Sequence, residues 1–396
     1  MQLVAYGAQD IYLTGNPQIT FFKVVYRRHT NFACESIEQT FNGSIDFGNR
    51  VTATIARNGD LIKSMHLEAD LPVINTAGEY WTNGLGNAMI KKAEIEIGGQ
   101  LIDRHYGEWM DIWTHLTTPY DKRAVGYDLM VGNSDVLDTT NGEQKRRLYI
   151  PLQFWFCRNP GLALPLIALQ YHEVKLNIEL RASADVIVGT TTSANMNSCK
   201  LYVDYVYLDT DERRRFAQVS HEYLIEQVQF TGDESIAASS STKNVTLNYN
   251  HPVKELIWVH VTDANSSTTN KKWLTYSGTQ TENNYGQNDS FNTAKLQLNG
   301  HDRFSVRKSD YFRLVQNFDH HTRVPSKHIY SYSFALKPED HQPTGTCNFS
   351  RIDNATMLFT YDTTNTTVAA SKVKMYAVNY NVLRIMSGMG GLAYSN

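Results

Sequence analysis

The sequence predicts an all-β protein made of two β-sandwich domains. Its 396 residues exceed one ordinary hydrophobic core and suit two domains of about 200 residues each. Hydrophobic residues make up 41% of the chain and charged residues 19%, and the 23 Tyr and 16 Phe favour strands over helices. Apolar and polar residues also alternate with a period of two in many short segments, which is typical of strands with one buried face.

The clearest alternating segment is the run in which Ala93, Ile95 and Ile97 are separated by glutamates. Further predicted strands span residues 174–180, 201–208, 256–261, 294–298 and 373–382. Turn sequences lie at residues 58–60, 98–99, 141–142 and 299–300. Many short strands with frequent turns indicate a sandwich or a barrel rather than a βαβ fold.

Two short helices are predicted between the strands. Within residues 107–118, Trp109, Ile112, Trp113 and Leu116 have the spacing of a single apolar stripe. Residues 309–317 have a similar spacing, with Ser309 as the candidate N-cap.

These helices take part in an internal duplication. Residues 93–100 (AEIEIGGQ) match residues 294–301 (AKLQLNGH) in pattern, and an Asp-Arg pair and a short aromatic helix follow each segment. Coincidence between two ordinary strand-turn-helix segments is the alternative. An aromatic strand, a Pro-containing loop and another strand then follow in both halves, at residues 148–156 and 329–336, which favours two copies of one domain.

The predicted domain boundary lies at residues 209–220, where a strand ends in a charged stretch. Arg213, Arg214 and Arg215 follow three acidic residues there, so we expect local pairing rather than nucleic-acid binding. Residues 262–292 are rich in Ser, Thr, Asn and Gln and are expected to form a long exposed loop.

Several classes of function are disfavoured. The net charge of −3 gives no positive field to attract nucleic acid. The four widely spaced cysteines form no CxxC pair, so we expect reduced, mostly buried thiols. Neither a secretion signal nor an apolar run of membrane-spanning length is seen. We therefore predict a chain that can touch a membrane without crossing it.

No catalytic, cofactor-binding or metal-binding residues are predicted. His320, His321, His328 and His341 lack the spacing of a metal site and are expected to be ordinary core or surface histidines. Residues 387–391 (SGMGG) lack the Lys-Ser/Thr of a phosphate-binding loop, so they are expected to form a flexible tail that packs against a neighbour.

Five long segments, in order from one end of the chain to the other, carry a family resemblance. They are residues 21–32 (FFKVVYRRHTNF), 164–174 (LPLIALQYHEV), 207–216 (YLDTDERRRF), 342–354 (QPTGTCNFSRIDN) and 380–394 (YNVLRIMSGMGGLAY). Together they resemble the major capsid proteins of nucleocytoplasmic large DNA viruses, and most closely those of algal viruses and their mimivirus-like relatives.

The resemblance implies two tandem eight-stranded jelly-roll β-sandwiches, a double jelly roll with short helices in its loops. It divides the chain into an N-terminal arm (1–24), a first jelly roll (25–210), a linker (211–220) and a second jelly roll with a C-terminal tail (221–396). It further implies a non-enzymatic protein that forms homotrimeric, pseudo-hexagonal capsomers and tiles an icosahedral virion shell assembled in the host cytoplasm. The implied partners are neighbouring capsomers, minor capsid and penton proteins, and peripherally an internal viral membrane, with no direct contact to nucleic acid.

Two groups of residues are candidate contact or modification sites. In the family the N-terminal arm lies on the inner face of the capsid, where Lys23, Arg27, Arg28 and His29 would suit phosphate headgroups or acidic partners. The alternative is that these residues are the solvent-facing side of a first strand. Among seven Asn-x-Ser/Thr sequences, Asn265 and Asn288 lie in the polar loop and are the candidates for exposed glycosylation sites.

Two other functions remain possible on the sequence. Polar loops rich in Asn and Tyr would also suit a β-sandwich binding module at the virion surface, such as a spike, a minor capsid protein or a glycan-binding lectin. A β-sandwich hydrolase has only the scattered histidines in its favour.

Overall fold

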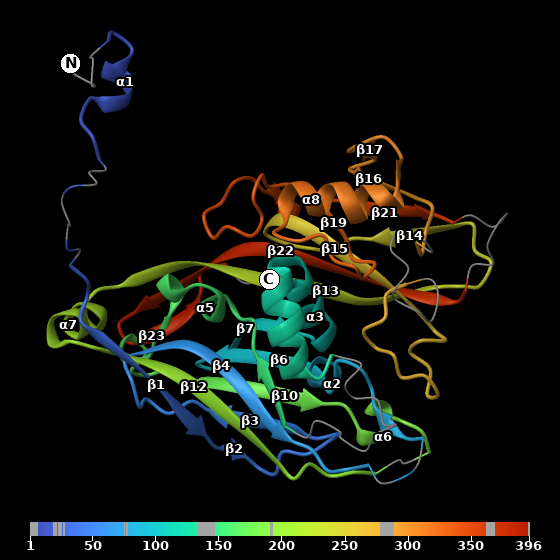
Figure 1. Cartoon of the computed structure of the whole chain (residues 1–396), viewed down its shortest axis with the longest axis horizontal. Helices are drawn as coiled ribbons and strands as arrows, with labels where there is room; N and C mark the ends of the chain where they lie inside the picture. The colour runs from blue at the N-terminus through green and yellow to red at the C-terminus, as the bar shows by residue number, and fades with distance from the viewer. Residues whose placement is uncertain are drawn as a thin grey trace, which may run out of the picture. The chain divides into compact units, whose positions relative to one another are not determined.

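The computed structural model describes residues 7–18, 22, 26, 28–74, 76, 78–133, 147–190, 193–277, 289–361 and 369–394. The chain divides into two units, Met1–Phe32 and Ala33–Asn396. The first unit contains one short helix, α1 (Asp10–Thr14). The second unit contains all the sheets (Figure 1).

The first half of the second unit is a sandwich of two antiparallel sheets. One sheet has the order β1 (Phe32–Gln39), β12 (Ser198–Leu208), β4 (Leu61–Asp70) and β8 (Arg147–Pro151), with β9 (Leu164–Pro165) added to β4. The other has the order β2 (Phe41–Asn42), β3 (Arg50–Thr54), β10 (Val174–Leu180), β6 (Ile90–Ile97) and β7 (Gln100–His105). A small ribbon joins β5 (Tyr80–Trp81) to β11 (Ile187–Val188).

Helices fill the connections of this half. They are α2 (Leu85–Ala88), α3 (Gly107–Thr117), the π-helical turn η1 (Lys122–Tyr127), α4 (Asp128–Val131), α5 (Trp155–Arg158), the 3₁₀ turns η4 (Pro160–Leu162) and η5 (Leu166–Ala168), and α6 (Ser183–Val186).

The second half repeats this architecture. One sheet has the order β13 (His221–Ile236), β22 (Ser371–Met386), β15 (Pro252–Thr262) and β19 (Tyr330–Ser333), with β20 (Cys347–Asn348) beside β15 and β23 (Met389–Leu392) beside β22. The other has the order β14 (Thr242–Thr246), β21 (Ala355–Thr360), β16 (Thr293–Leu298) and β17 (His301–Asp302), with β18 (Arg307–Lys308) beside β16. The helical elements are α7 (Thr210–Gln218), the π-helical turn η6 (Tyr311–Val315), α8 (Gln316–His320) and the 3₁₀ turn η7 (Phe349–Arg351).

The predicted duplication is confirmed by the order of the strands. The sheet order β1-β12-β4-β8 repeats as β13-β22-β15-β19, and β3-β10-β6-β7 repeats as β14-β21-β16-β17. The two matched sequence segments form equivalent hairpins, β6–β7 and β16–β17. Their turns, Gly98-Gly99 and Asn299-Gly300, have positive φ at both positions, the conformation that a tight two-residue hairpin requires. Each half is therefore a jelly roll, as the sequence predicts.

Each jelly roll has its own hydrophobic core between its two sheets. Along β4 the inward residues Met65, Leu67 and Ala69 are buried, and the residues between them are half-buried. Strand β15 differs because nearly all of its residues are buried, on both faces of the sheet. Something outside the second sandwich must therefore cover the outer face of β15.

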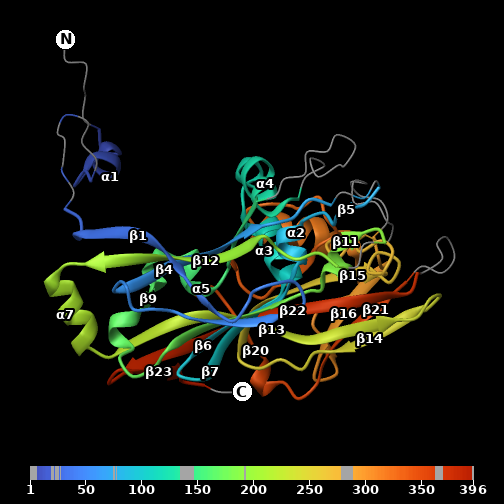
Figure 2. The same ribbon diagram turned by 90° about the horizontal axis from the view of Figure 1, so that it is seen from below.

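Helix α3 provides that cover. The predicted helix is confirmed, but the expected one-sided stripe is wrong, because ten consecutive residues from Gly107 to Leu116 are all buried. Met110 joins the core of the first jelly roll, while Trp109, Ile112, Trp113 and Leu116 join a third core with residues of β15 and β22. Figure 1 shows α3, in teal, between the strands of the two halves, and Figure 2 gives the view turned by 90°. The first jelly roll thus inserts a helix into the outer face of the second.

The second predicted helix starts differently from the expectation. Residues 311–315 form a π-helical turn that continues as α8, and the residue before it is Asp310, whose side chain makes no capping hydrogen bond. The expected N-cap role of Ser309 is therefore wrong. Ser309 instead donates its backbone N–H to Asn292 O at 3.0 Å.

The charged stretch between the halves is a helix, α7. Asp209 caps it by accepting hydrogen bonds from the backbone of Asp211 (3.0 Å) and Glu212 (3.2 Å). The expected local pairing of the arginines is wrong for Arg213, which forms an ion pair with Asp60 of the first jelly roll at 3.1 Å. The expectation of a wholly exposed loop at residues 262–292 is also wrong, because Lys271 and Leu274–Ser277 are buried.

The C-terminal glycine segment is ordered against the first jelly roll of the same chain. Strand β23 forms a hairpin with β22, and His172 Nδ1 lies 2.9 Å from Gly390 O. A Cβ on Gly390 would lie only 2.5 Å from Leu169 Cδ2, so a larger residue there would force the Leu169 side chain to shift. The expected flexible tail is therefore wrong for the described residues up to 394.

The interface helix yields a first prediction. Trp109→Ala should lower the free energy of unfolding by about 3–5 kcal/mol, because it removes a fully buried indole from the third core. Chemical denaturation of both proteins measures this change. Val125→Ala, at a residue 71% exposed, is the control and should cost less than about 1 kcal/mol. Equal costs for the two substitutions would show that α3 does not hold the halves together.

Candidate functional site

The interface between the two jelly rolls has an apolar centre surrounded by buried ion pairs. On α3, Glu108 forms ion pairs with Arg181 (2.5 Å) and with Lys374 of the second jelly roll (3.3 Å). Burial alone would raise the pKa of Glu108, but the charges of Lys374 and Arg181 outweigh burial and hold this pKa below its usual value. Glu108 is therefore an ionised, buried link between the halves.

One turn further along α3, Asp111 makes a second link. Its Oδ2 lies 2.9 Å from Lys327 Nζ and accepts a hydrogen bond from Tyr276 Oη at 3.1 Å. Burial opposes ionisation of Asp111, yet the Lys327 charge outweighs burial and keeps its pKa well below the usual range. Burial lowers the pKa of the adjacent His115 to about 4, so this imidazole is neutral at pH 7.

A third link lies beside Trp113. Glu226 of β13 forms ion pairs with Arg158 of the first jelly roll (3.1 Å) and with Lys254 of β15 (2.8 Å). The Arg158 guanidinium also lies 4.2 Å from the centre of the Trp113 ring. Buried ions are tolerated when each has a partner of opposite charge, and these three satisfy that condition.

The second jelly roll also contains a buried histidine that pairs with two carboxylates. His321 lies between two carboxylates, with Nε2 3.0 Å from Glu255 Oε2 and Nδ1 2.9 Å from Glu339 Oε1. Burial lowers the pKa of His321, but the charge of Glu255 and the contact with Glu339 outweigh it and raise this pKa to about 9. His321 is therefore an imidazolium at neutral pH.

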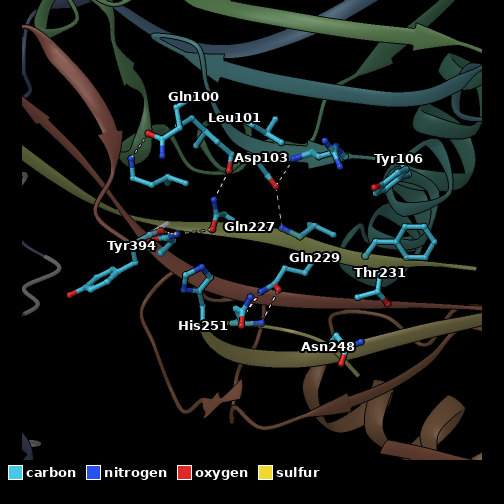
Figure 3. A pocket seen from close by; sticks show the side chains of 17 residues that line it. Gln100, Leu101, Asp103, Tyr106, Gln227, Gln229, Thr231, Asn248, His251 and Tyr394 are labelled. Carbon is cyan, nitrogen blue, oxygen red and sulfur yellow. Dashed lines mark hydrogen bonds between the residues drawn. The ribbon is translucent and has the colours of Figure 1, made fainter. Parts of the chain in front are cut away.

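A polar cleft of about 380 Å³ lies where β7, β13 and the C-terminal segment meet (Figure 3). Its polar groups bind one another: Gln227 donates to Ile102 O, Val228 N donates to Asp103 Oδ1 (3.1 Å), and Asn381 donates to Gln227 Oε1 (3.0 Å). The cleft is a hydrogen-bonded seam between the jelly rolls.

The structure places two of the four predicted arm residues. Arg28 and His29 are exposed, and His29 Nδ1 lies 2.9 Å from Thr30 O. Lys23 and Arg27 lie outside the described residues. The predicted contact of this arm with a partner or membrane stays a prediction.

The two glycosylation candidates have different outcomes. Asn265 is 0% exposed, so the expectation that it is an exposed acceptor is wrong. Its buried position follows from a tight turn in which its backbone N–H bonds to Thr262 O at 3.0 Å. Asn288 lies outside the described residues.

Metal and membrane features are absent from the part of the chain that the structure describes. No group of three or more His, Cys, Asp or Glu residues there could hold a metal ion. No helix among those residues is long and apolar enough to cross a bilayer. All four cysteines are free; Cys157, Cys199 and Cys347 are half-buried and Cys34 is exposed.

Comparison with known proteins decides the family. A family described as major capsid protein N-terminus matches residues 20–209, and one described as large eukaryotic DNA virus major capsid protein matches residues 212–391. The major capsid protein of Pyramimonas orientalis virus is 55% identical, with 100% of this chain and 99% of that protein covered. The chain belongs to the major capsid proteins of large eukaryotic DNA viruses. The counterpart from Paramecium bursaria Chlorella virus 1 is 46% identical over the same shares of both chains.

Solved structures of capsid proteins share this fold. A chain of the PBCV-1 virus capsid matches with a TM-score of 0.81 and 42% identity, covering 95% of this chain and 100% of that chain. The Faustovirus major capsid protein matches with a TM-score of 0.76 at 12% identity, covering 96% and 94% of the two chains, which shows a common fold alone. The double jelly roll is therefore a shared architecture of this family.

The ion-pair network was not predicted from the sequence. Lys254 and Glu255 stand inside the otherwise apolar strand β15, and charged residues in such a strand could have indicated buried partners. Those partners, Glu226 and His321, are distant along the chain, so only the folded structure identifies them.

His321 gives a prediction about pH. Its pKa is about 9 in the folded protein and 6.5 as the ordinary value, so its stabilising effect is complete below about pH 6.5 and is lost as pH rises through about 9. The shift corresponds to roughly 3 kcal/mol. Unfolding measured at pH 6, 7.5 and 9 should show a larger alkaline loss in the parent protein than in His321→Gln. Parallel pH curves for the two proteins would contradict the ion-pair assignment.

Proposed function

We propose that three copies of this chain form a pseudo-hexagonal capsomer that tiles the icosahedral shell of a large DNA virus. The observation that carries the proposal is the rigid tandem of two similar jelly rolls, because three copies supply six similar units around a threefold axis. The likeness to a chain of the PBCV-1 virus capsid at 42% identity supports the same assignment. The proposal includes a division of the chain into an N-terminal arm (1–24), a first jelly roll (25–210), a linker (211–220) and a second jelly roll with a C-terminal tail (221–396).

The proposed mechanism is assembly in two stages. A large, permanent interface forms first within the trimer, and smaller, wetter contacts between capsomers follow and allow misplaced units to dissociate. The protein has no catalytic role in this proposal and binds no nucleic acid directly. Neighbouring capsomers, penton proteins and minor capsid proteins are its partners, and assembly takes place in the host cytoplasm.

The N-terminal arm is proposed to contact minor capsid proteins and, peripherally, an internal viral membrane. Apolar side chains in the arm support this role, because Ile11, Tyr12 and Leu13 are all exposed. Further along the arm, the exposed Arg28 and His29 add positive charge or hydrogen-bond donors.

The solution mass tests the trimer. Three chains of 45.0 kDa should give a species of about 135 kDa by light scattering after size exclusion. Electron microscopy of concentrated protein should then show hexagonal tiles. A well-folded species of 45.0 kDa at all concentrations would contradict the capsomer and favour a virion-surface binding module.

A further inference from the structure

The contact between the two jelly rolls of one chain shows which surfaces of a jelly roll bind a neighbouring jelly roll. On β15, Leu256 and Trp258 face the core of the second jelly roll, whereas Ile257, Val259 and Val261 face outward and meet α3. Strand β22 pairs Tyr376 with Ile257 and Lys374 with Val259 on that outward face.

Two contacts of α3 fix its place on this face. Its Trp109 ring lies 5.3 Å from the ring of Tyr376, and Glu108 forms an ion pair with Lys374 at 3.3 Å. The helix of one jelly roll therefore binds a Tyr-Lys pair on the sheet of the next.

The second jelly roll carries an equivalent helical segment whose outward face is uncovered. Met110 of α3 and Phe312 of η6 each occupy the core of their own jelly roll, which aligns the two segments. This alignment pairs Ile112, Trp113 and Leu116 with Leu314, Val315 and Phe318. The first three are 0%, 5% and 0% exposed, and their counterparts are 41%, 45% and 77% exposed. The same alignment pairs Glu108 with Asp310.

The first jelly roll in turn carries an equivalent sheet face, whose outward residues are half-buried in the single chain. Strands β4 and β12 pair Tyr202 with His66 and Lys200 with Glu68 there. The spacing of Tyr202 and Lys200 is that of Tyr376 and Lys374.

In both sheets the lysine of this pair also contacts an acidic residue on the adjacent strand. Lys200 forms an ion pair with Glu38 of β1 (3.1 Å), and Lys374 forms one with Asp233 of β13 (3.5 Å). Strand β1 occupies the same place in its sheet as β13, so the Tyr-Lys pair and its neighbouring acid are duplicated.

We propose that the uncovered helical segment of one copy (Asp310 to Phe318) packs on the outer face of β4 and β12 in the next copy, as α3 packs on β15 and β22 within a chain. This inference rests on the proposed trimer and names the surfaces that close it. Asp310 takes the place of Glu108 beside Lys200, and Leu314, Val315 and Phe318 lie against the sheet around Tyr202. Three such contacts alternate with the three contacts inside the chains, so a head-to-tail arrangement closes into a ring.

The two kinds of contact differ in chemistry. The outward residues of β4 are His66, Glu68 and Asp70, where β15 has Ile257, Val259 and Val261. The contact between copies is therefore more polar than the contact within a chain. A polar acceptor face keeps the separate chain soluble before assembly, whereas the apolar one is covered as soon as the chain folds.

Cross-linking tests the pairing of surfaces. In a Cys34→Ser background, Asp310→Cys combined with Lys200→Cys should be joined between chains by a short bis-maleimide, giving covalent dimers and trimers on a denaturing gel. The matched control combines Lys200→Cys with Asp302→Cys, another exposed acidic residue of the second jelly roll, and should give at least tenfold less product.

Light scattering of the same samples separates this proposal from the trimer itself. A trimer that cross-links no better than the control would contradict the assigned surfaces but would still agree with the proposed capsomer. A monomer would overturn both proposals.

Disruption of the helical face provides a second test. The triple variant Leu314→Ser, Val315→Ser, Phe318→Ser should keep its melting curve as a chain but lose the trimer at concentrations where the parent is trimeric. The control Val125→Ser, Leu129→Ser removes exposed apolar side chains from the first jelly roll and should remain trimeric. A triple variant that stays trimeric would contradict the proposed packing of residues 310–318 on the next copy.

Discussion

Burial of helix α3 on every side is the constraint on which the rest of the structure depends. Met110 anchors the helix in the first jelly roll, while Trp109 and Ile112 fill the outer face of the second. Each fully buried large side chain contributes about 1.5–3 kcal/mol, so a few of them fix two sandwiches as one body. The two jelly rolls accordingly belong to one compact unit of the chain, Ala33–Asn396.

The charges around α3 give this interface its specificity. Glu108 and Asp111 each bind a lysine of the second jelly roll, and Glu226 binds an arginine of the first. A shift of the helix by one turn would leave these ions buried without partners, which costs several kcal/mol for each ion. The apolar contacts therefore supply the driving force, and the ion pairs select one register.

Equivalent outer faces of the two duplicated sheets differ in their chemistry. The outer face of β15 is apolar because α3 covers it during folding of the same chain. The equivalent face of β4 carries His66 and Glu68 and remains half-exposed in the single chain. The outer face of β15 is therefore a buried interface, whereas the equivalent face of β4 is a polar, half-exposed surface.

The sequence alone determined the all-β class, the duplication, both helices and the family, because alternation, turn residues and motifs are local signals that survive in any context. It could not determine that α3 is buried all round, that Asn265 is covered, or that the glycine tail is ordered. Nor could it pair Glu226 with Arg158 or His321 with Glu255. Those outcomes depend on which segments meet across the interface between the halves, and burial and charge pairing are set by neighbours that lie far away along the chain.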